Sequence, residues 1–504
     1  MKKSIFKTIP RWIIIIIIVY TLIFGFISLD RHNTFHSGWD LGIFEDSMHN
    51  TFKGKFFYNN DFEMNFLGNH FNLFYILFAQ PIYYIFPFTG TILFLQAFFL
   101  IIGVIPLYWL TKLKLKKEYF ARIIVITYAL FPITWIINLE DFHPNIFAVP
   151  LILFVFYYME KKDWKKYFVF LALLLMVQEE IAFIVMALGI YMLLVKNRKI
   201  GLLTLIIGLL WLQLVVGWIM PQLNTSEAFG EGYFFMNLRY DYLGEDFSEA
   251  AKTIVLNPVR AFTHTPADNK ITFILFYLKA FIFIPLLSLS FIVLLPIILL
   301  NTLSTDSFQI CPNSHHSVYL IPMLFVSFVY GLRNIQEWFS TRIAKIAIII
   351  FLVSIIITSG MLGVAPWFVK EPVVNDQFFG GQGCFKNEYR LISKTEFHPT
   401  QKHYKEMHEL LKTIPMNVSI IAAQHVYPHL IKRDSTKSFH FFDLEYSSKE
   451  KILQEESDYL LIDPSDVWTA FESEMYEGEN YQLSIYGYKK IYELDGIFLF
   501  RKGD

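Results

Sequence analysis

The sequence predicts an all-α polytopic membrane bundle of about eleven transmembrane helices, followed by a smaller C-terminal α/β domain outside the membrane. Of the 504 residues, 55% are hydrophobic and the mean hydropathy is +0.43, whereas soluble domains are about 45–50% apolar. The apolar residues form runs of about 15–22 between short charged loops, a pattern typical of spanning helices. After residue 361 the chain becomes polar and no spanning run follows.

Each expected span is assigned from its apolar run. The first run follows Lys2, Lys3, Lys7 and Arg11 and lacks a small-residue cleavage site, so we expect an uncleaved first helix with its N-terminus inside. Several runs are short, which favours tilted or partly inserted helices. The expected spans are 12–29, 90–111, 121–138, 146–159, 167–178, 181–195, 200–221, 271–285, 287–302, 318–331 and 344–361.

The apolar segment 71–86 is left out of this set because of the charges that follow it. Counting it as a span would place the basic loop 112–122 outside, against the positive-inside rule. We therefore expect segment 71–86 to be a helix that lies in the outer interface or dips into the membrane and back out. The inside segments 1–11, 112–122, 160–166, 196–199 and 332–345 then hold 4, 5, 4, 3 and 3 Lys or Arg residues, and the outside hairpins 139–145, 179–180 and 303–317 hold none.

This topology predicts a multi-pass protein of the cytoplasmic membrane, with residues 1–361 as the membrane domain. Its long outer loops, 30–89 and 222–270, are expected to carry interfacial helices. Residues 362–504 are expected to form the outer domain. A helix is predicted at 399–413, with strands at 418–423, 438–443, 459–463, 486–492 and 497–501 and a hairpin turn at Asp495-Gly496.

Charge and cysteine content exclude several classes of function. The net charge of -1 gives no field that would attract nucleic acid, so no nucleic-acid partner is expected. Two cysteines, Cys311 and Cys384, make no disulfide framework and no zinc motif. The sequence does not decide whether these two cysteines form a single disulfide bridge.

The first polar constellation follows the first span. Leu41, Phe44 and Met48 recur at helical spacing, which predicts a short amphipathic helix over 41–53 on the membrane surface, with Glu45 on it. Asp40 falls at the expected N-cap position. It caps the helix, is a carboxylate held at the interface as a base or metal ligand, or does both.

Two acidic hairpins are further candidates. Glu140, Asp141 and His143 lie within four residues and offer oxygen and imidazole ligands for a divalent cation such as Mg²⁺ or Mn²⁺, unless the loop is simply solvated. Glu179 and Glu180 join two short helices, which places these carboxylates at membrane depth, where they are usually functional.

The remaining candidates are cationic or neutral. His70 precedes the interfacial segment, and His315 with His316 suits hydrogen bonding to a polar head group or plain solvation. Arg239 is the first candidate among the few outer cations to stabilise an anionic group, ahead of Arg31, Lys252 and Arg260. The candidate metal ligands are Asp40, Asp141 and His143, and the candidate catalytic residues are Asp40, Asp141 and Glu179. The candidate substrate-binding residues are Glu45, His70, Glu140, His143, Glu180, Arg239, His315 and His316.

Several stretches resemble a large family of bacterial and archaeal polytopic membrane proteins known as a domain of unknown function. They are WDLGIFED at 39–46, HFNLFYILFAQPIY at 70–83, DFHPN at 141–145, QEEIAFIVMALGIYML at 178–193, HHSVYLIPMLF at 315–325, AAQHVYPHL at 422–430 and DYLLIDP at 458–464. That family in turn resembles the GT-C superfamily of lipid-linked glycosyltransferases. The resemblance implies that Asp40 matches the acid of the first outer loop and Glu140 or Asp141 the acid of the second. The first acid stands alone rather than in a paired motif, which leaves metal dependence open.

The resemblance implies a membrane glycosyltransferase with the lipid bilayer, a polyprenyl-phosphate sugar donor and a cell-envelope acceptor as partners. A transporter or flippase for a lipid-linked or small polar solute is the alternative, with Lys279 in a span as its main support. A non-catalytic assembly protein is a third possibility. The absence of a sequence repeat and the gathering of polar clusters at one face favour the enzyme.

Overall fold

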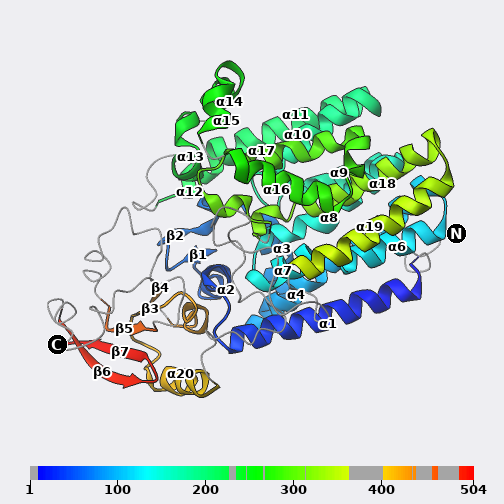
Figure 1. Ribbon diagram of the computed structural model, residues 1–504. Helices are drawn as coiled ribbons and strands as arrows, with labels where there is room; N and C mark the ends of the chain where they lie inside the picture. Colours follow the sequence, from blue (N-terminus) through cyan, green and yellow to red (C-terminus); the bar gives the residue numbers. More distant parts are fainter. Residues whose placement is uncertain are drawn as a thin grey trace. The chain divides into compact units, whose positions relative to one another are not determined.

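A computed structural model describes residues 9–225, 234–245, 247–264, 267–312, 314–362, 401–433, 435–438, 457–463 and 487–503 (Figure 1). The chain divides into two compact units, which we describe separately. The membrane unit comprises Met1–Ser28 with Leu67–Ser393, and the loop–tail unit comprises Leu29–Phe66 with Lys394–Asp504.

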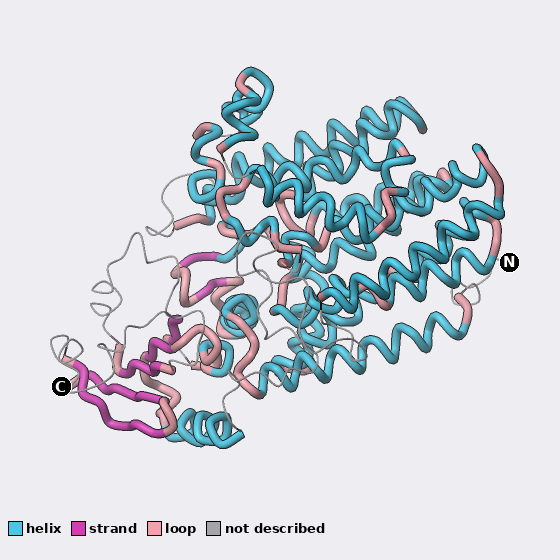
Figure 2. Tube along the Cα trace, viewed as in Figure 1, coloured by secondary structure: helices cyan, strands magenta, loops and turns pink. Residues whose placement is uncertain are grey.

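The membrane unit is helical (Figures 1 and 2). The first helix, α1 (Arg11–Asn33), begins in this unit and ends in the other. The longer helices that follow are α3 (Leu73–Ile85), α4 (Thr89–Ile102), α5 (Val104–Leu115), α6 (Glu118–Ala129), α7 (Pro132–Glu140), α8 (Ala148–Lys161), α9 (Trp164–Leu175), α10 (Ile181–Val195), α11 (Arg198–Leu214), α16 (Ala267–Ala280), α17 (Leu295–Leu303), α18 (Leu320–Trp338) and α19 (Thr341–Met361). Four short helices lie between α11 and α16, namely α12 (Met220–Leu223), α13 (Phe234–Arg239), α14 (Phe247–Leu256) and α15 (Pro258–Thr263).

Six helical segments of the described residues are long and apolar enough to cross a membrane: Arg11–Asn33, Thr89–Leu115, Glu118–Glu140, Arg198–Leu223, His315–Trp338 and Thr341–Met361. Three shorter apolar segments, Leu73–Ile85, Ile181–Val195 and Leu289–Leu303, fall below that length. The helical membrane fold is therefore confirmed, and the total of eleven spans stays a prediction. Segment 71–86 folds as α3, whose 13 residues would rise about 20 Å, less than the roughly 30 Å hydrocarbon core.

Helix α18 lies at the core of the membrane unit, because most of its side chains are buried and it packs against α5, α8 and α19. Helices α10 and α11 pack along each other at glycines. A Cβ added at Gly189 would lie 2.6 Å from the backbone nitrogen of Leu205, and one at Gly201 would lie 2.6 Å from that of Leu193. Small residues at such crossings let helix backbones approach closely within a membrane.

The expected single helix over 287–302 is wrong in detail. Two 3-10 segments, Ile284–Leu287 and Leu289–Leu294, precede α17. Ser288 lies between the two segments, and its hydroxyl is 2.8 Å from that of Ser290, which contacts Ser327 Oγ of α18 at 3.1 Å. Because serine hydroxyls compete for local hydrogen bonds, an apolar run alone does not reveal such a break.

The loop–tail unit contains a five-stranded sheet of order β4-β3-β5-β7-β6. Strands β3, β4 and β5 are parallel, β7 is antiparallel to β5 and β6, and helix α20 (Gln401–Thr413) precedes β3. Asp495 and Gly496, both with positive φ, form the expected hairpin turn. The strands are β3 (Ile420–Ala422), β4 (Thr436–Ser438), β5 (Tyr459–Ile462), β6 (Tyr488–Leu494) and β7 (Ile497–Lys502).

The same unit contains helix α2 (Trp39–Phe52) and the small hairpin of β1 (Tyr58–Asn59) and β2 (Met64–Asn65). The expected amphipathic surface helix forms, but its polar side is not solvated, since Glu45, Asp46 and Ser47 are fully buried. Asp46 turns toward the hairpin, where it accepts hydrogen bonds from the Asn60 backbone N–H and side-chain amide, both at 2.8 Å.

Residues 29–66 thus share a compact unit with the C-terminal residues, although they were expected to belong to the membrane domain. The proposed boundary after residue 361 lies beside residues 363–400, which are outside the described part of the chain.

Candidate functional site

Four of the expected outer segments meet in the membrane unit. The backbone N–H of His315 donates to Glu140 Oε2 at 3.0 Å, and the Asn145 side chain donates to the carbonyl of His315 at 3.1 Å. His70 contacts Glu179, and the Tyr319 hydroxyl donates to Gln178 Oε1 at 3.0 Å. Hairpins 140–145 and 178–180 and segments 70–72 and 314–319 therefore form a single polar region between helix ends.

The closest group of potential ligands in this region is Glu140, His143 and His315. One ligand atom from each lies within 4.8 Å of the others. Glu140 Oε1 is 3.6 Å from His315 Nδ1, Glu140 Oε2 is 4.0 Å from His143 Nε2, and the two imidazole rings stack with centroids 3.6 Å apart. Glu140 is the last residue of α7, and the hydrogen bond from the His143 backbone N–H to Gln96 Oε1, at 3.0 Å, fixes the following loop.

These residues fit a divalent cation. Among the described residues, neither His143 Nε2 nor His315 Nδ1 has a hydrogen-bond partner, although both nitrogens are buried. Burial lowers the pKa of His143 well below its ordinary value, and repulsion from His315 and His70 adds to this. The imidazole is therefore neutral, as a metal ligand must be. Two imidazoles and a carboxylate suit zinc or another first-row metal better than Mg²⁺.

This group differs from the expected metal ligands Asp40, Asp141 and His143. Only His143 is common to both sets. Asp40 belongs to the loop–tail unit, and the carbonyl oxygen of Asp141 accepts a hydrogen bond from Gln96 Nε2 at 2.8 Å. His315 lies far along the chain from Glu140 and His143, so their spacing could not have predicted the group.

Glu179 and His70 form a second buried pair. Glu179 Oε1 is 2.9 Å from His70 Nδ1, and Oε2 accepts the backbone N–H of Phe71 at 2.9 Å. Burial alone would raise the pKa of Glu179, but the attraction of His70 and these hydrogen bonds lower it below its ordinary value. Glu179 is thus an ionised side chain with both oxygens engaged, an arrangement that suits the orientation of His70 better than the expected catalytic role.

The pKa of Glu180 is shifted in the opposite direction. Burial raises the pKa of Glu180 to about 8, and the Glu179 carboxylate adds to the rise, while Arg239 opposes it. At neutral pH Glu180 is therefore mostly protonated and able to donate a hydrogen bond. Two adjacent carboxyl groups with their pKa values pushed apart are typical of functional sites.

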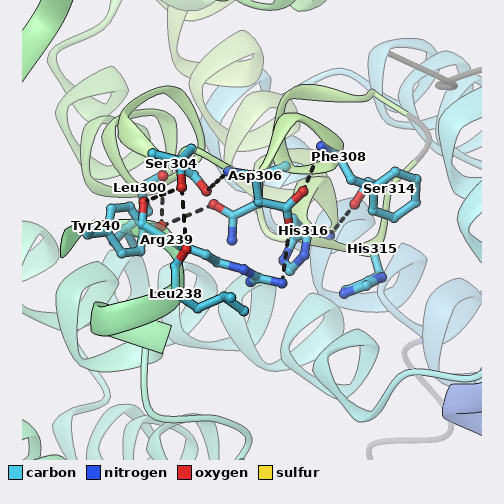
Figure 3. A network of polar contacts seen from close by, with 12 residues as sticks. Leu238, Arg239, Tyr240, Leu300, Ser304, Asp306, Phe308, Ser314, His315 and His316 are labelled. Atoms are coloured by element: carbon cyan, nitrogen blue, oxygen red, sulfur yellow. Dashed lines mark hydrogen bonds and ion pairs between the residues drawn. The ribbon is translucent and has the colours of Figure 1, made fainter. Parts of the chain in front are cut away.

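Arg239, at the end of α13, supplies a positive charge to the region (Figure 3). Its Nη2 lies 3.1 Å from Asp306 Oδ2, and it interacts electrostatically with Glu180, His315 and His316. The backbone N–H of Thr305 donates to the Arg239 carbonyl at 2.9 Å, which joins α13 to the segment after α17. Asp306 was not among the candidate residues from the sequence.

Cys311 lies in the same loop as Asp306 and His315, is fully buried and is disulfide-bonded. The chain's other cysteine, Cys384, is outside the described residues. A disulfide indicates an oxidising compartment, which agrees with the outer location expected for this loop.

Asp40 lies in the first turn of α2 in the loop–tail unit. The N-cap is Gly38, and no side chain caps the helix, so the expectation that Asp40 occupies the capping position is wrong. Glu45, on the same helix, is fully buried. Trp39, beside Asp40, donates its indole N–H to Asp61 Oδ2 at 2.6 Å, and Asp61 also accepts the Ser438 backbone N–H at 2.8 Å at the end of β4.

The loop–tail unit also contains a polar group that the sequence did not single out as a site. His403 Nε2 of α20 and His425 Nε2 lie 3.0 and 2.9 Å from the same oxygen of Asp463. Asp463 follows β5 and His425 follows β3, and these strands are parallel neighbours. His425 and Asp463 lie in the family-like stretches 422–430 and 458–464, each at or just after the end of a predicted strand. Because carboxyl ends of parallel strands meet at one sheet edge, these stretches could have indicated the group.

Comparisons with known proteins bear on the fold and the family. The fold is similar to that of ArnT from Cupriavidus metallidurans bound to undecaprenyl phosphate, with a TM-score of 0.52 and 9% sequence identity. The match covers 98% of this chain and 99% of that chain, and it agrees with the GT-C-like architecture expected from the sequence. No curated protein matches the chain. A family described as predicted membrane protein (DUF2079) matches residues 31–499, and the chain belongs to this family.

Proposed function

We propose that the protein is a membrane-embedded glycosyltransferase that transfers a sugar from a polyprenyl-phosphate donor to a cell-envelope acceptor on the outer face of the cytoplasmic membrane. The observation that carries the proposal is the similarity over nearly the whole chain to ArnT, whose structure holds undecaprenyl phosphate. The polar region of carboxylates, imidazoles and Arg239 at the helix ends supports it. A transporter would need a polar path through the bundle, whereas the candidate site residues of the membrane unit lie at helix ends.

The proposed reaction needs a base and a charge for the leaving group. The base takes the proton of an acceptor hydroxyl, the acceptor oxygen bonds to the anomeric carbon, and the bond from that carbon to the phosphate oxygen breaks. Asp40 is the proposed base, since an interfacial carboxylate can act at hydrogen-bond distance. Arg239 is proposed to stabilise the departing phosphate. Polyprenyl phosphate, with one more negative charge than the donor, is the product.

The proposed cofactor is a divalent cation held by Glu140, His143 and His315. Bound there, it would supply Lewis-acid and charge-stabilising chemistry. Metal analysis of the purified protein tests this directly. We expect close to one equivalent of metal in the wild type, and loss of most of it in Glu140→Gln and His315→Ala, but not in the matched variant His264→Ala. Wild-type protein free of metal after growth in supplemented medium would contradict the assignment.

The function itself is tested with purified protein in nanodiscs. A panel of synthetic polyprenyl-phosphate sugars is supplied with envelope extract from a deletion strain, and release of polyprenyl phosphate is followed by mass spectrometry. We expect release from one donor class, with transfer to an extract component. If proteoliposomes instead move an intact lipid-linked sugar between leaflets without breaking it, the protein is a flippase.

A further inference from the structure

The ion pair between Arg239 and Asp306 has a geometry in which a phosphate could replace the Asp306 carboxylate. Asp306 offers Arg239 a single oxygen, Oδ2, because its Oδ1 accepts the backbone N–H of Phe308 at 2.9 Å. The guanidinium group prefers two parallel hydrogen bonds to a carboxylate or phosphate. A terminal phosphate group has three oxygens, none of which is bonded to the Phe308 N–H. It can therefore accept the two parallel hydrogen bonds that Asp306 cannot.

The surroundings allow the exchange without a change in the backbone. The Arg239 carbonyl accepts a hydrogen bond from the Thr305 backbone N–H at 2.9 Å, so the two chain segments stay joined when the Arg239 and Asp306 side chains move. Figure 3 shows these two side chains joined by their ion pair. The next residue, Tyr240, donates its hydroxyl to the Leu300 carbonyl at 2.9 Å. The Asp306 side chain is 30% exposed, so rotation about its side-chain bonds brings its carboxylate into water.

A bound counter-charge is needed at this position. The Arg239 side chain is 11% exposed, and it interacts electrostatically with the half-buried residues His315 and His316. A largely buried guanidinium without an anion would be costly. Asp306 supplies a negative charge of this kind, and an anion that binds Arg239 through Nη2 must displace it.

On this basis we infer that Asp306 occupies the phosphate position at Arg239 and competes with the phosphate of the bound lipid. The inference rests on the proposed function. The donor is a phosphodiester with one negative charge, whereas the product polyprenyl phosphate is a monoester that carries close to two. Arg239 alone would hold the product more tightly than the donor. Competition from Asp306 weakens both and favours release of the product.

Binding of farnesyl phosphate, a short polyprenyl phosphate, tests the inference in detergent-solubilised full-length protein. Asp306→Asn keeps an oxygen that accepts the Phe308 N–H, since Asn also caps well, but it removes the competing charge. We expect the Kd of farnesyl phosphate to fall about tenfold in this variant, the effect of removing one charge-assisted contact. Arg239→Gln should raise the Kd about tenfold or more. Glu337→Gln, which breaks the Arg333–Glu337 pair, is the matched control and should leave it unchanged.

Farnesol and inorganic phosphate separate the contributions of the lipid and the headgroup. Farnesol affinity should not respond to Asp306→Asn, and phosphate affinity should respond like that of farnesyl phosphate. Unchanged or weaker farnesyl phosphate binding in a folded Asp306→Asn protein would overturn the inference, even if sugar transfer occurs. Tighter binding without any transfer would uphold the inference and contradict the proposed function, so the two outcomes are distinguishable.

Discussion

Glu179 illustrates what decides the role of a single polar residue in this protein. Its carboxylate appears in the sequence as an acid at membrane depth, yet both oxygens hold neighbours, His70 Nδ1 and the Phe71 N–H. Glu180, one residue later, has its pKa raised to about 8, first by burial and then by Glu179. Residue type and depth identified the position, but hydrogen-bond partners 108 and 109 residues away set the chemistry.

Asp40 gives the sharpest prediction at this scale, because its capping role is excluded by Gly38 as the N-cap. As a first-turn acid it stabilises α2 through the helix dipole by about 0.3–1 kcal/mol. Asp40→Asn should therefore change the melting temperature little, whereas loss of a general base slows a reaction about 10²–10⁴-fold. Release of polyprenyl phosphate and thermal unfolding are measured on the same preparation.

The control for this variant is Asp163→Asn, which alters an exposed acid that does cap a helix, α9. It should cost about as much stability and leave turnover intact. If Asp40→Asn retains turnover within about threefold of wild type, a margin far below the expected loss of a base, Asp40 is not the base.

The loop–tail unit shows how a whole element is positioned. A Cβ added at Gly42 of α2 would lie 2.3 Å from the Tyr427 ring, so the helix and the segment after β3 approach closely only with glycine there. His429 Nε2 contacts the His32 carbonyl at 3.0 Å, and Asp61 holds Ser438 at the end of β4. The helix that carries Asp40 is therefore held by residues of the C-terminal sheet.

The stability of the C-terminal sheet is expected to depend on pH. Burial would lower the pKa of His403, but Asp463 and the Asp495 carbonyl raise it above the ordinary value, and His403 and His425 hold the pKa of Asp463 well below its usual range despite burial. The contribution of Asp463 is present above about pH 4 and lost on acidification. The contribution of His403 is complete below about pH 6.5 and is lost as the pH rises through its raised folded pKa.

We therefore expect the strands β3 and β5 to be most stable between these limits. Hydrogen exchange of the full-length protein, corrected for the intrinsic pH dependence, should show protection at about pH 5.5 that declines by about pH 9, above the expected loss of the His403 charge. In His403→Gln the decline should disappear. His408→Gln, which alters a half-buried histidine on α20 whose Nε2 contacts the Asn33 carbonyl, should behave like wild type. Equal decline in both variants would show that the His403–Asp463 pair is not responsible.

For the molecule as a whole, the sequence was sufficient for the class of fold and insufficient for the contacts between distant segments. Apolar runs predicted helices such as α19 and α11 because these helices are long, apolar and mostly not buried against other parts of the protein. Nothing local in residues 29–66 predicted a shared unit with the C-terminal sheet, since contacts such as His429 with His32 join residues 397 apart. The group of Glu140, His143 and His315 was likewise predicted only in part. The sequence placed Glu140 and His143 in one hairpin, but His315 lies 175 residues from Glu140.

The last prediction concerns orientation of the entire chain. Cys311 is disulfide-bonded and lies in the loop between α17 and α18, next to the site. Disulfides persist outside the cytoplasm, whereas Lys and Arg gather in loops that remain inside. The disulfide predicts an outside location for loop 303–317. The charge distribution predicts the same location for loops 222–270 and 303–317 and an inside location for loop 112–122.

The test uses single cysteines in a variant that lacks Cys311 and Cys384, labelled with a maleimide that cannot cross the membrane. Lys252→Cys, in the exposed outer loop, should react in intact cells, and Lys116→Cys, in the exposed basic loop, should react only after lysis. In the otherwise unaltered protein, Cys311 should react only after reduction and unfolding, because it is buried as well as disulfide-bonded. Labelling of Lys116→Cys in intact cells would invert the topology and place Arg239, Asp306 and His315 in the cytoplasm. A polyprenyl-phosphate sugar in the outer leaflet would then be out of reach, and the proposed function would fail together with the orientation.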